Sequence, residues 1–140
     1  DLYGWIKFLG WFNFSLLVLN SSLFITRWFY RKFNKKLQNF PWEGFKGLMK
    51  FLAKVHPFTG GILLVTALYH GYLATGGFVI YSGSLVFFGV LAQFIVYLLG
   101  KYAPAMKKSW RPVHRSLMLV TWALFFVHLF GPYSIWIPIF

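Results

Sequence analysis

Residues 55–100 read VHPFTGGILLVTALYHGYLATGGFVIYSGSLVFFGVLAQFIVYLLG and contain no Asp, Glu, Lys or Arg. About 20 apolar residues are enough for a helix to cross the roughly 30 Å hydrocarbon core of a bilayer, so this stretch can form two such helices. The residues Ala74-Thr75-Gly76-Gly77 interrupt it with a short turn signal. We therefore predict two membrane-spanning helices joined by a tight turn.

Two further uncharged stretches lie on either side of this one. Phe8–Thr26 precedes it, and Ser116–Phe140 follows it, with Gly131-Pro132 expected to end the last helix before an aromatic tail. The sequence thus predicts an all-α integral membrane protein, a four-helix bundle that forms one domain. Its expected spans are residues 5–26, 51–73, 78–100 and 112–131, and a basic segment, 27–50, separates the first two.

The composition supports lipid as the solvent. Of the 140 residues, 59% are hydrophobic, 24% aromatic and only 11% charged, whereas soluble domains are about 25% charged. A soluble fold of this size could not hide so much apolar surface. There is no cysteine, which excludes disulfides, thiolate-held iron–sulfur clusters and c-type haem attachment. Because the sequence begins with Asp1, we expect an initiator methionine or a longer N-terminal part to precede it.

The charged residues predict the orientation of the bundle. Fourteen Lys and Arg stand against two acids, Asp1 and Glu43. Thirteen of the fourteen cations fall in residues 27–54 and 101–115, the two connections on one side of the predicted bundle. The positive-inside rule assigns that side to the cytoplasm, with both termini opposite, and in a prokaryote to the cell inner membrane. Cations clustered between apolar runs argue against nucleic acid as a partner, which needs a polar basic surface.

The basic segment 27–50 mixes lysines with seven aromatic residues. This pattern favours an interfacial helix or loop that contacts anionic membrane lipid. An ordinary basic loop that only sets the topology explains it about as well. Glu43 lies in this segment and could accept a proton from a quinol, although a lone interfacial Glu more often neutralises a nearby Lys.

The four histidines, His56, His70, His114 and His128, are spaced by fourteen residues within each of two spans. Fourteen helical residues return a side chain to within roughly 40° of its starting face and advance it about 21 Å. The second and fourth spans both run outward from the basic side, so they are parallel. We therefore expect His56 to lie at the depth of His114, and His70 at the depth of His128.

Two facing histidines at each depth favour haem over a bare metal ion. Zinc or copper normally takes three or four protein ligands at one point, whereas haem supplies four nitrogens and needs two axial ligands. Chlorophyll, usually held by one ligand, is a weaker alternative, as is a purely structural hydrogen bond from each histidine. Ionisable groups at membrane depth are costly and are functional candidates. The prediction is two haem b groups stacked between the second and fourth spans.

A family resemblance rests on His56-Pro57 with His70, and on Arg111-Pro112-Val113-His114-Arg115 with His128. Over roughly residues 50–130 the chain resembles the di-haem membrane cytochromes b, which include the four-helix core of cytochrome bc complexes and the ferric-reductase-like membrane domain. The resemblance implies that His56 and His114 ligate an inner haem iron, and His70 and His128 an outer one. Gly10, Gly83 and Gly89 do not repeat at fourteen residues, so the similarity is to a cofactor arrangement.

Several neighbouring residues are candidates for binding the cofactors. Gly60 and Gly61 lie one turn past His56, where a missing side chain would let a porphyrin approach, although small residues equally mark close helix packing. Arg111 and Arg115 flank His114 and could pair with haem propionates; roles in topology or lipid binding are as plausible. Lys54 is a weaker inner candidate, and Lys7 is the available cation on the outer side.

Bis-histidine iron has no open coordination position, which favours electron transfer. The chain has no nucleotide fingerprint or catalytic triad, so electrons must be exchanged with other redox subunits, soluble carriers or a quinone. We expect a membrane-anchor cytochrome b subunit of a larger oxidoreductase complex, with its partner docked on the basic side. A stand-alone quinone or metal reductase is one alternative, and a cofactor-free membrane scaffold is the other.

Overall fold

The computed structural model describes residues 1–138 and is built almost entirely of helices. Each of four helices is long and apolar enough to cross a membrane. The predicted all-helical architecture with four helices of spanning length is therefore confirmed. The elements are α1 (Leu2–Phe33), α2 (Trp42–Thr75), β1 (Val79–Tyr81), α3 (Ser82–Tyr102), the 3-10 turn η1 (Pro104–Met106), α4 (Trp110–Phe130) and β2 (Trp136–Pro138).

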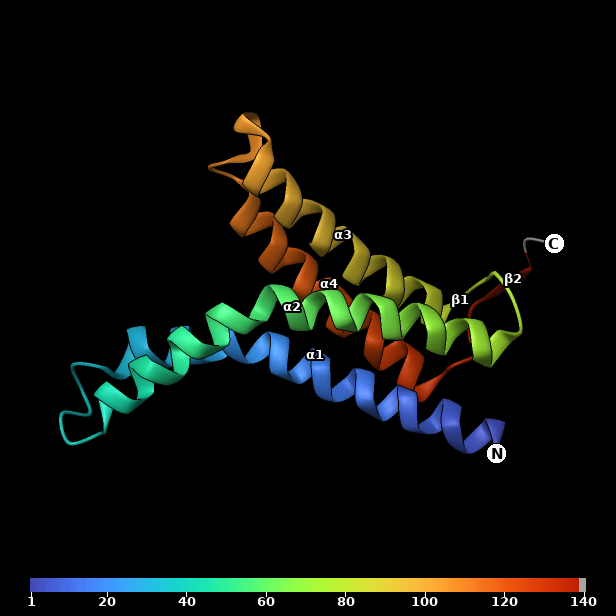
Figure 1. Cartoon of the computed structure of the whole chain (residues 1–140), viewed down its shortest axis with the longest axis horizontal. Coiled ribbons are helices and arrows are strands. Elements are labelled where there is room, and N and C mark those ends of the chain that lie inside the picture. Colours follow the sequence, from blue (N-terminus) through green and yellow to red (C-terminus); the bar gives the residue numbers. More distant parts are fainter. Residues whose placement is uncertain (139–140) are drawn as a thin grey trace.

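The four helices form two hairpins. α1 contacts mainly α2, and α3 contacts mainly α4. The N-terminus and the C-terminal strand lie at one end of the molecule, and the loop between α1 and α2 lies at the other (Figure 1). α2 ends where the sequence predicts a turn, because Gly76 adopts a positive φ of 71° that favours glycine. α4 ends at Phe130, directly before Gly131-Pro132.

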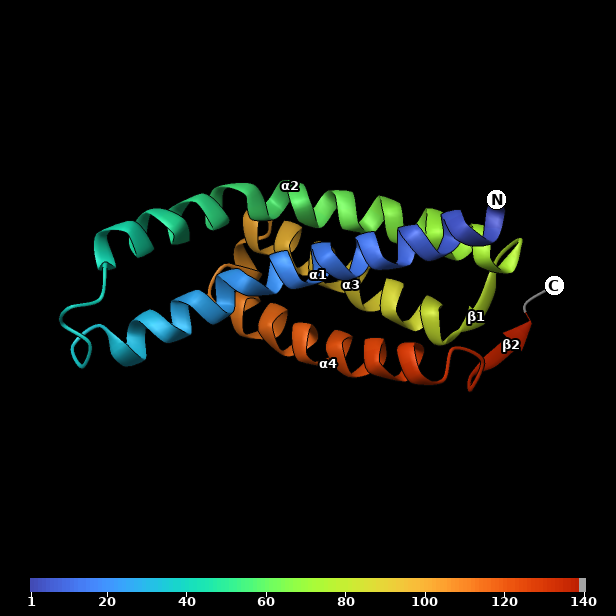
Figure 2. The ribbon, with the colours of Figure 1, turned by 90° about the horizontal axis from the view of Figure 1, so that it is seen from below.

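The hairpins differ in length. α1 and α2 contain 32 and 34 residues, whereas α3 and α4 contain 21 each. At 1.5 Å per residue the first pair is about 50 Å long and the second about 32 Å, which is close to the hydrocarbon thickness. α1 and α2 consequently project beyond α3 and α4 at the end that carries their connecting loop (Figure 2).

The projection differs from the separate interfacial helix or loop that was expected at residues 27–50. Residues 27–33 continue α1, residues 42–50 belong to α2, and only 34–41 form the connection. Aromatic side chains supply the physical reason, because they give the hairpin tip a packed centre of its own. The ring centres of Phe29 and Phe45 lie 5.6 Å apart, and those of Phe40 and Trp42 lie 4.4 Å apart.

A short two-stranded β ribbon connects the segment that follows α2 with the segment that follows α4. β1 pairs antiparallel with β2, and Ile80 is opposite Ile137. From the sequence, only an aromatic tail is expected here. All three residues of β1, and Trp136 and Ile137 of β2, are β-branched or aromatic, and these types favour pairing once the helices bring the strands together. The ribbon holds the start of α3 against the segment that follows α4.

The interior between the helices is small and lies near the middle of the bundle. Leu17, Leu63 and Val90 form a buried apolar cluster, and Trp122 of α4 donates a 2.8 Å hydrogen bond to Ser21 of α1. Many large apolar side chains instead point outward; Phe58, for example, is 72% exposed. Such an apolar exterior fits a lipid-facing surface.

Candidate cofactor site

The structure brings the four histidines together as two pairs, each formed by α2 and α4. The ring centres of His56 and His114 lie 6.1 Å apart, and those of His70 and His128 lie 6.5 Å apart. These are the pairs expected from equal spacing on two parallel helices. No pair forms within a single helix, because fourteen residues separate the two positions along the helix axis by about 21 Å.

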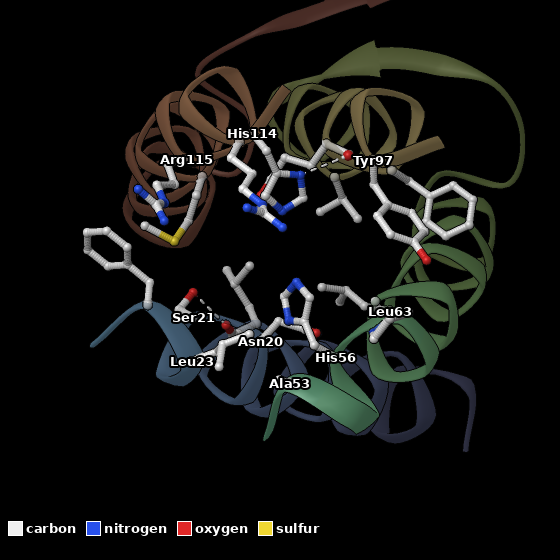
Figure 3. A pocket seen from close by; sticks show the side chains of 18 of the residues that line it. Asn20, Ser21, Leu23, Ala53, His56, Leu63, Tyr97, His114 and Arg115 are labelled. Carbon is white, nitrogen blue, oxygen red and sulfur yellow. Dashed lines mark hydrogen bonds between the residues drawn. The ribbon is translucent and has the colours of Figure 1, made fainter. Parts of the chain in front are cut away.

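The separation within each pair suits one metal ion between two rings. An imidazole nitrogen lies about 2 Å from a metal that it ligates and about 1 Å from its own ring centre, so two opposed ligands have ring centres about 6 Å apart. Both observed separations are close to this value. In Figure 3 the rings of His56 and His114 point toward one another across a cavity.

The histidines of α4 are oriented by α3. Nδ1 of His114 lies 3.0 Å from the backbone carbonyl of Gln93, which can only accept, so this nitrogen carries the proton. Nδ1 of His128 lies 3.0 Å from the Ser82 hydroxyl, which itself donates to the carbonyl of Pro132 at 2.6 Å. In both rings Nε2 therefore keeps its lone pair for a ligand bond, as the second shell of metal-binding histidines commonly arranges.

The histidines of α2 lie against α1 and are less tightly held. Nδ1 of His56 and Nδ1 of His70 are buried without a hydrogen-bond partner. The backbone carbonyls of Asn20 and Ile6 are the nearby acceptors, outside hydrogen-bond geometry. An unpaired buried polar atom is costly. A small rotation of each ring onto α1 would satisfy it, and a group bound at Nε2 would favour that rotation.

The inner pair lies in a cavity of about 280 Å³. Its walls combine apolar and polar side chains, as is common for cofactor sites. Gly60 lies in the wall, and both arginines flanking His114 reach the cavity. Asn20 and Tyr97, labelled in Figure 3, also line the cavity, together with Phe24, Phe94, Trp110 and Met118.

The outer pair lies in a second cavity of about 410 Å³. Gly10 of α1 contributes to its wall, and a Cβ placed there would lie 3.3 Å from the His70 ring. Tyr81 also lines it, with its ring centre 5.8 Å from that of His128.

The two cavities meet at the buried cluster of the bundle. Leu17, Leu63 and Val90 line both of them. The three side chains come from α1, α2 and α3, so they form an apolar partition between two sites of the same kind. Each cavity contains one histidine pair.

The charged groups around the cavities correspond in part to those expected. Arg111 and Arg115 line the inner cavity, and Lys7 lines the outer one. Lys54 and Gly61 line neither cavity; a Cβ at Gly61 would meet nothing within 4 Å. Sequence reasoning missed Arg27 and Arg31, which reach the inner cavity from α1. Their place at the end of the first span was a signal that could have included them.

The site lacks the ligands that a bare metal ion needs. Within residues 1–138, no group of three or more His, Asp or Glu side chains converges. Glu43, the only acidic residue in the sequence besides Asp1, pairs with Lys46 at 3.3 Å on the exposed hairpin tip. The described residues therefore fit a cofactor that supplies most of its metal's ligands itself and needs two imidazoles from the protein.

The polar residues that support the histidines were not selected by sequence reasoning. Thr59 donates to the side chain of Asn20 at 2.8 Å, and Gln93 donates to Thr121 at 2.9 Å. Each bond joins the two helices of one hairpin, Thr59 within one turn of His56 and Thr121 midway between His114 and His128 along α4.

Comparisons with protein-family models, characterised proteins and solved structures each find no match to this chain.

Proposed function

We propose that the protein carries electrons across a membrane through two b-type haems, each held between one histidine of α2 and one of α4. The observation that carries this proposal is the pair of cavities, each containing two opposed imidazoles. A scaffold that bound only partner helices would have no need for two such cavities in its interior.

The ligand chemistry supports haem rather than a bare ion. The two sites offer two imidazoles each, and no third His, Asp or Glu joins either pair among the described residues. Held by two histidines each, the bound groups would supply one-electron transfer rather than oxygen activation. His56 and His114 would hold one group, and His70 and His128 the other.

The chain's own residues fix these ligands and shield them. Gln93 and Ser82 select the Nδ1–H form of the α4 histidines. The partition formed by Leu17, Leu63 and Val90 places a buried apolar layer between the two sites. A dry, apolar surrounding and hydrogen bonds to the axial ligands are the means by which proteins set haem potentials.

Cations at the mouth of the inner cavity support the binding of carboxylates there. Arg27 and Arg31 come from α1, and Arg111 and Arg115 from α4. Four like charges that line one cavity repel each other, and the sequence places no acid nearby other than Glu43, which pairs with Lys46. Two haem propionates would neutralise Arg111 and Arg115 through the bidentate bonds that guanidinium forms with carboxylate, which leaves Arg27 and Arg31 without an acidic partner.

The proposed physiological role is that of an electron-transfer subunit. The lone chain lacks a motif for a nucleotide or a catalytic triad, so donors and acceptors are other redox subunits, soluble carriers or a quinone. The basic end, which carries thirteen of the fourteen cations, is the surface for a cytoplasmic partner.

A haem count on the purified chain tests the proposal. The protein is expressed with a haem supply, purified in neutral detergent, and assayed by pyridine haemochrome against its amino-acid content. We expect two haem b groups per chain and reduced b-type α and Soret bands. A preparation that remains helical by circular dichroism and contains no haem would overturn the proposal in favour of a cofactor-free scaffold.

A further inference from the structure

A third cavity, of about 380 Å³, lies between α1 and α2 on the projecting part of their hairpin. It is lined by Arg27, Tyr30, Arg31, Lys46, Met49, Lys50 and Ala53. We name these residues the hairpin groove. It contains neither histidine pair, and the proposed haem sites do not use Tyr30, Lys46, Met49 or Lys50.

The groove is strongly cationic. Arg27 and Arg31 face it from α1, and Lys46 and Lys50 face it from α2. Glu43 is the only acid in this part of the sequence, and it pairs with Lys46 at 3.3 Å. Three cations therefore remain without an acidic partner around one small depression, which is an arrangement that an anion would stabilise.

The position of the groove along the membrane normal indicates the source of this anion. α3 and α4 are about as long as the hydrocarbon core is thick, and the headgroup layer adds roughly 5–8 Å on each side. Lys50 precedes His56 by six residues, which is about 9 Å along α2 toward the basic end. His56 lies at the depth of His114, near the start of α4, so the groove lies where lipid phosphates are found.

The other lining residues fit the same occupant. Tyr30 presents an aromatic ring with Nζ of Lys46 5.9 Å from its centre, and amphipathic aromatic residues are enriched at this level of a membrane. Met49 and Ala53 give the groove an apolar part, against which the glycerol end of a lipid can rest. Basic depressions between helices are typical binding sites of anionic lipid headgroups.

We propose that the hairpin groove binds the phosphate of one anionic phospholipid, with Lys46 and Lys50 on one side and Arg27 and Arg31 on the other. This proposal does not rest on haem binding, because the two lysines line the groove and neither histidine cavity. It differs from general attraction of a basic surface to an anionic bilayer, because it assigns one lipid to one set of residues.

The test compares two variants of equal charge. Lys46→Gln with Lys50→Gln removes two groove cations, and Lys35→Gln with Lys36→Gln removes two cations from the exposed loop that connects α1 and α2. Both are purified full-length in neutral detergent, checked for helix content by circular dichroism, and titrated with phosphatidylglycerol while native mass spectrometry counts bound lipid. Phosphatidylcholine and glycerol phosphate serve as the neutral lipid and the soluble anion.

We expect the unaltered chain and the loop variant to retain one tightly bound phosphatidylglycerol. The groove variant should bind it on the order of tenfold more weakly, since each cation near a lipid phosphate contributes to affinity. Equally weakened phosphatidylglycerol binding in both variants would mean that the lipid is held only by the overall positive charge, and it would overturn the proposal. Unchanged binding in the groove variant, equal retention of phosphatidylcholine, or displacement by glycerol phosphate at equal concentration would also overturn it.

Discussion

The Ser82 hydroxyl lies 3.0 Å from Nδ1 of His128 and donates its own proton to the carbonyl of Pro132. Ser82 is 1% exposed, so water does not compete for either bond. The hydroxyl can then only accept from the imidazole, which fixes the tautomer of His128. The corresponding group for His114 is the backbone carbonyl of Gln93, so the two histidines of α4 are oriented by one side chain and one peptide group.

Replacement of Ser82 is expected to change one haem potential and leave the other unchanged. A hydrogen bond that Nδ1 donates makes the imidazole a stronger electron donor and stabilises the oxidised iron. Ser82→Ala should therefore raise the midpoint potential of the outer haem, by an amount on the order of tens of millivolts if the bond is worth about 1 kcal/mol. A redox titration followed at the α band measures both haems at once.

The matched control is Ser84→Ala. Ser84 lies in the same helical turn, and its hydroxyl bonds to the carbonyl of Val79 rather than to a histidine. It should leave both potentials unchanged. An equal shift in the two variants, or a shift of the inner haem in Ser82→Ala, would contradict the assigned role of Ser82.

Gly10 offers a test of the outer site from α1. A Cβ at this position would lie 3.3 Å from Cε1 of His70, and a branched side chain would crowd the ring further. We expect Gly10→Val to lower the content of the outer haem and to spare the inner one, as measured by haem count and by the number of redox transitions. Retention of two haems with unaltered spectra would show that His70 does not depend on this contact.

The close packing of α3 against α4 at Gly89 leads to a prediction about thermal stability. A Cβ at Gly89 would lie 2.5 Å from Oγ1 of Thr121, a side chain that is fully buried. Overpacking of this kind costs about 1–3 kcal/mol, so Gly89→Ala should lower the thermal midpoint of the protein in detergent. Adding Thr121→Ala should restore part of the loss.

Gly61→Ala is the control for this prediction. Nothing lies within 4 Å of a Cβ at Gly61, and Ala is favoured over Gly in a helix by about 1 kcal/mol. The thermal midpoint should stay the same or rise slightly. A fall in the thermal midpoint as large as that of Gly89→Ala would contradict the open surroundings of Gly61.

The bond between Trp122 and Ser21 links the two hairpins. Nε1 of Trp122 donates to the Ser21 hydroxyl at 2.8 Å, and the indole packs edge-on against Phe14. Trp122→Phe keeps an aromatic ring and removes the donor, so we expect a loss of about 1 kcal/mol of stability. In a double-mutant cycle with Ser21→Ala the two losses should not add; full additivity would mean that the bond contributes nothing.

Much of the arrangement could be predicted from the sequence because lipid imposes strong constraints. Uncharged stretches such as residues 55–100 leave few alternatives to helices that cross a membrane. The equal spacing of His56–His70 and His114–His128 led to the two facing pairs, since parallel helices place equal intervals at equal depths. To predict which histidines face each other, only the number of spans and their direction were needed.

Other features depend on contacts between distant residues, which spacing alone does not reveal. Arg27 and Arg31 reach the inner cavity only because α1 continues beyond the level at which α4 starts, at Trp110. That continuation depends on aromatic packing at the hairpin tip, which local composition did not distinguish from an interfacial loop. Likewise, the roles of Ser82 and Gly10 depend on which helix face packs against which histidine.

Haem content of three double-histidine variants tests the central claim most directly. If each site consists of one histidine from α2 and one from α4, His56→Ala with His114→Ala empties one site and leaves one haem per chain. His56→Ala with His128→Ala, and His56→Ala with His70→Ala, damage both sites and leave none. Pyridine haemochrome on helical, purified protein gives the count. One haem retained in His56→Ala with His70→Ala, and none in His56→Ala with His114→Ala, would contradict the account.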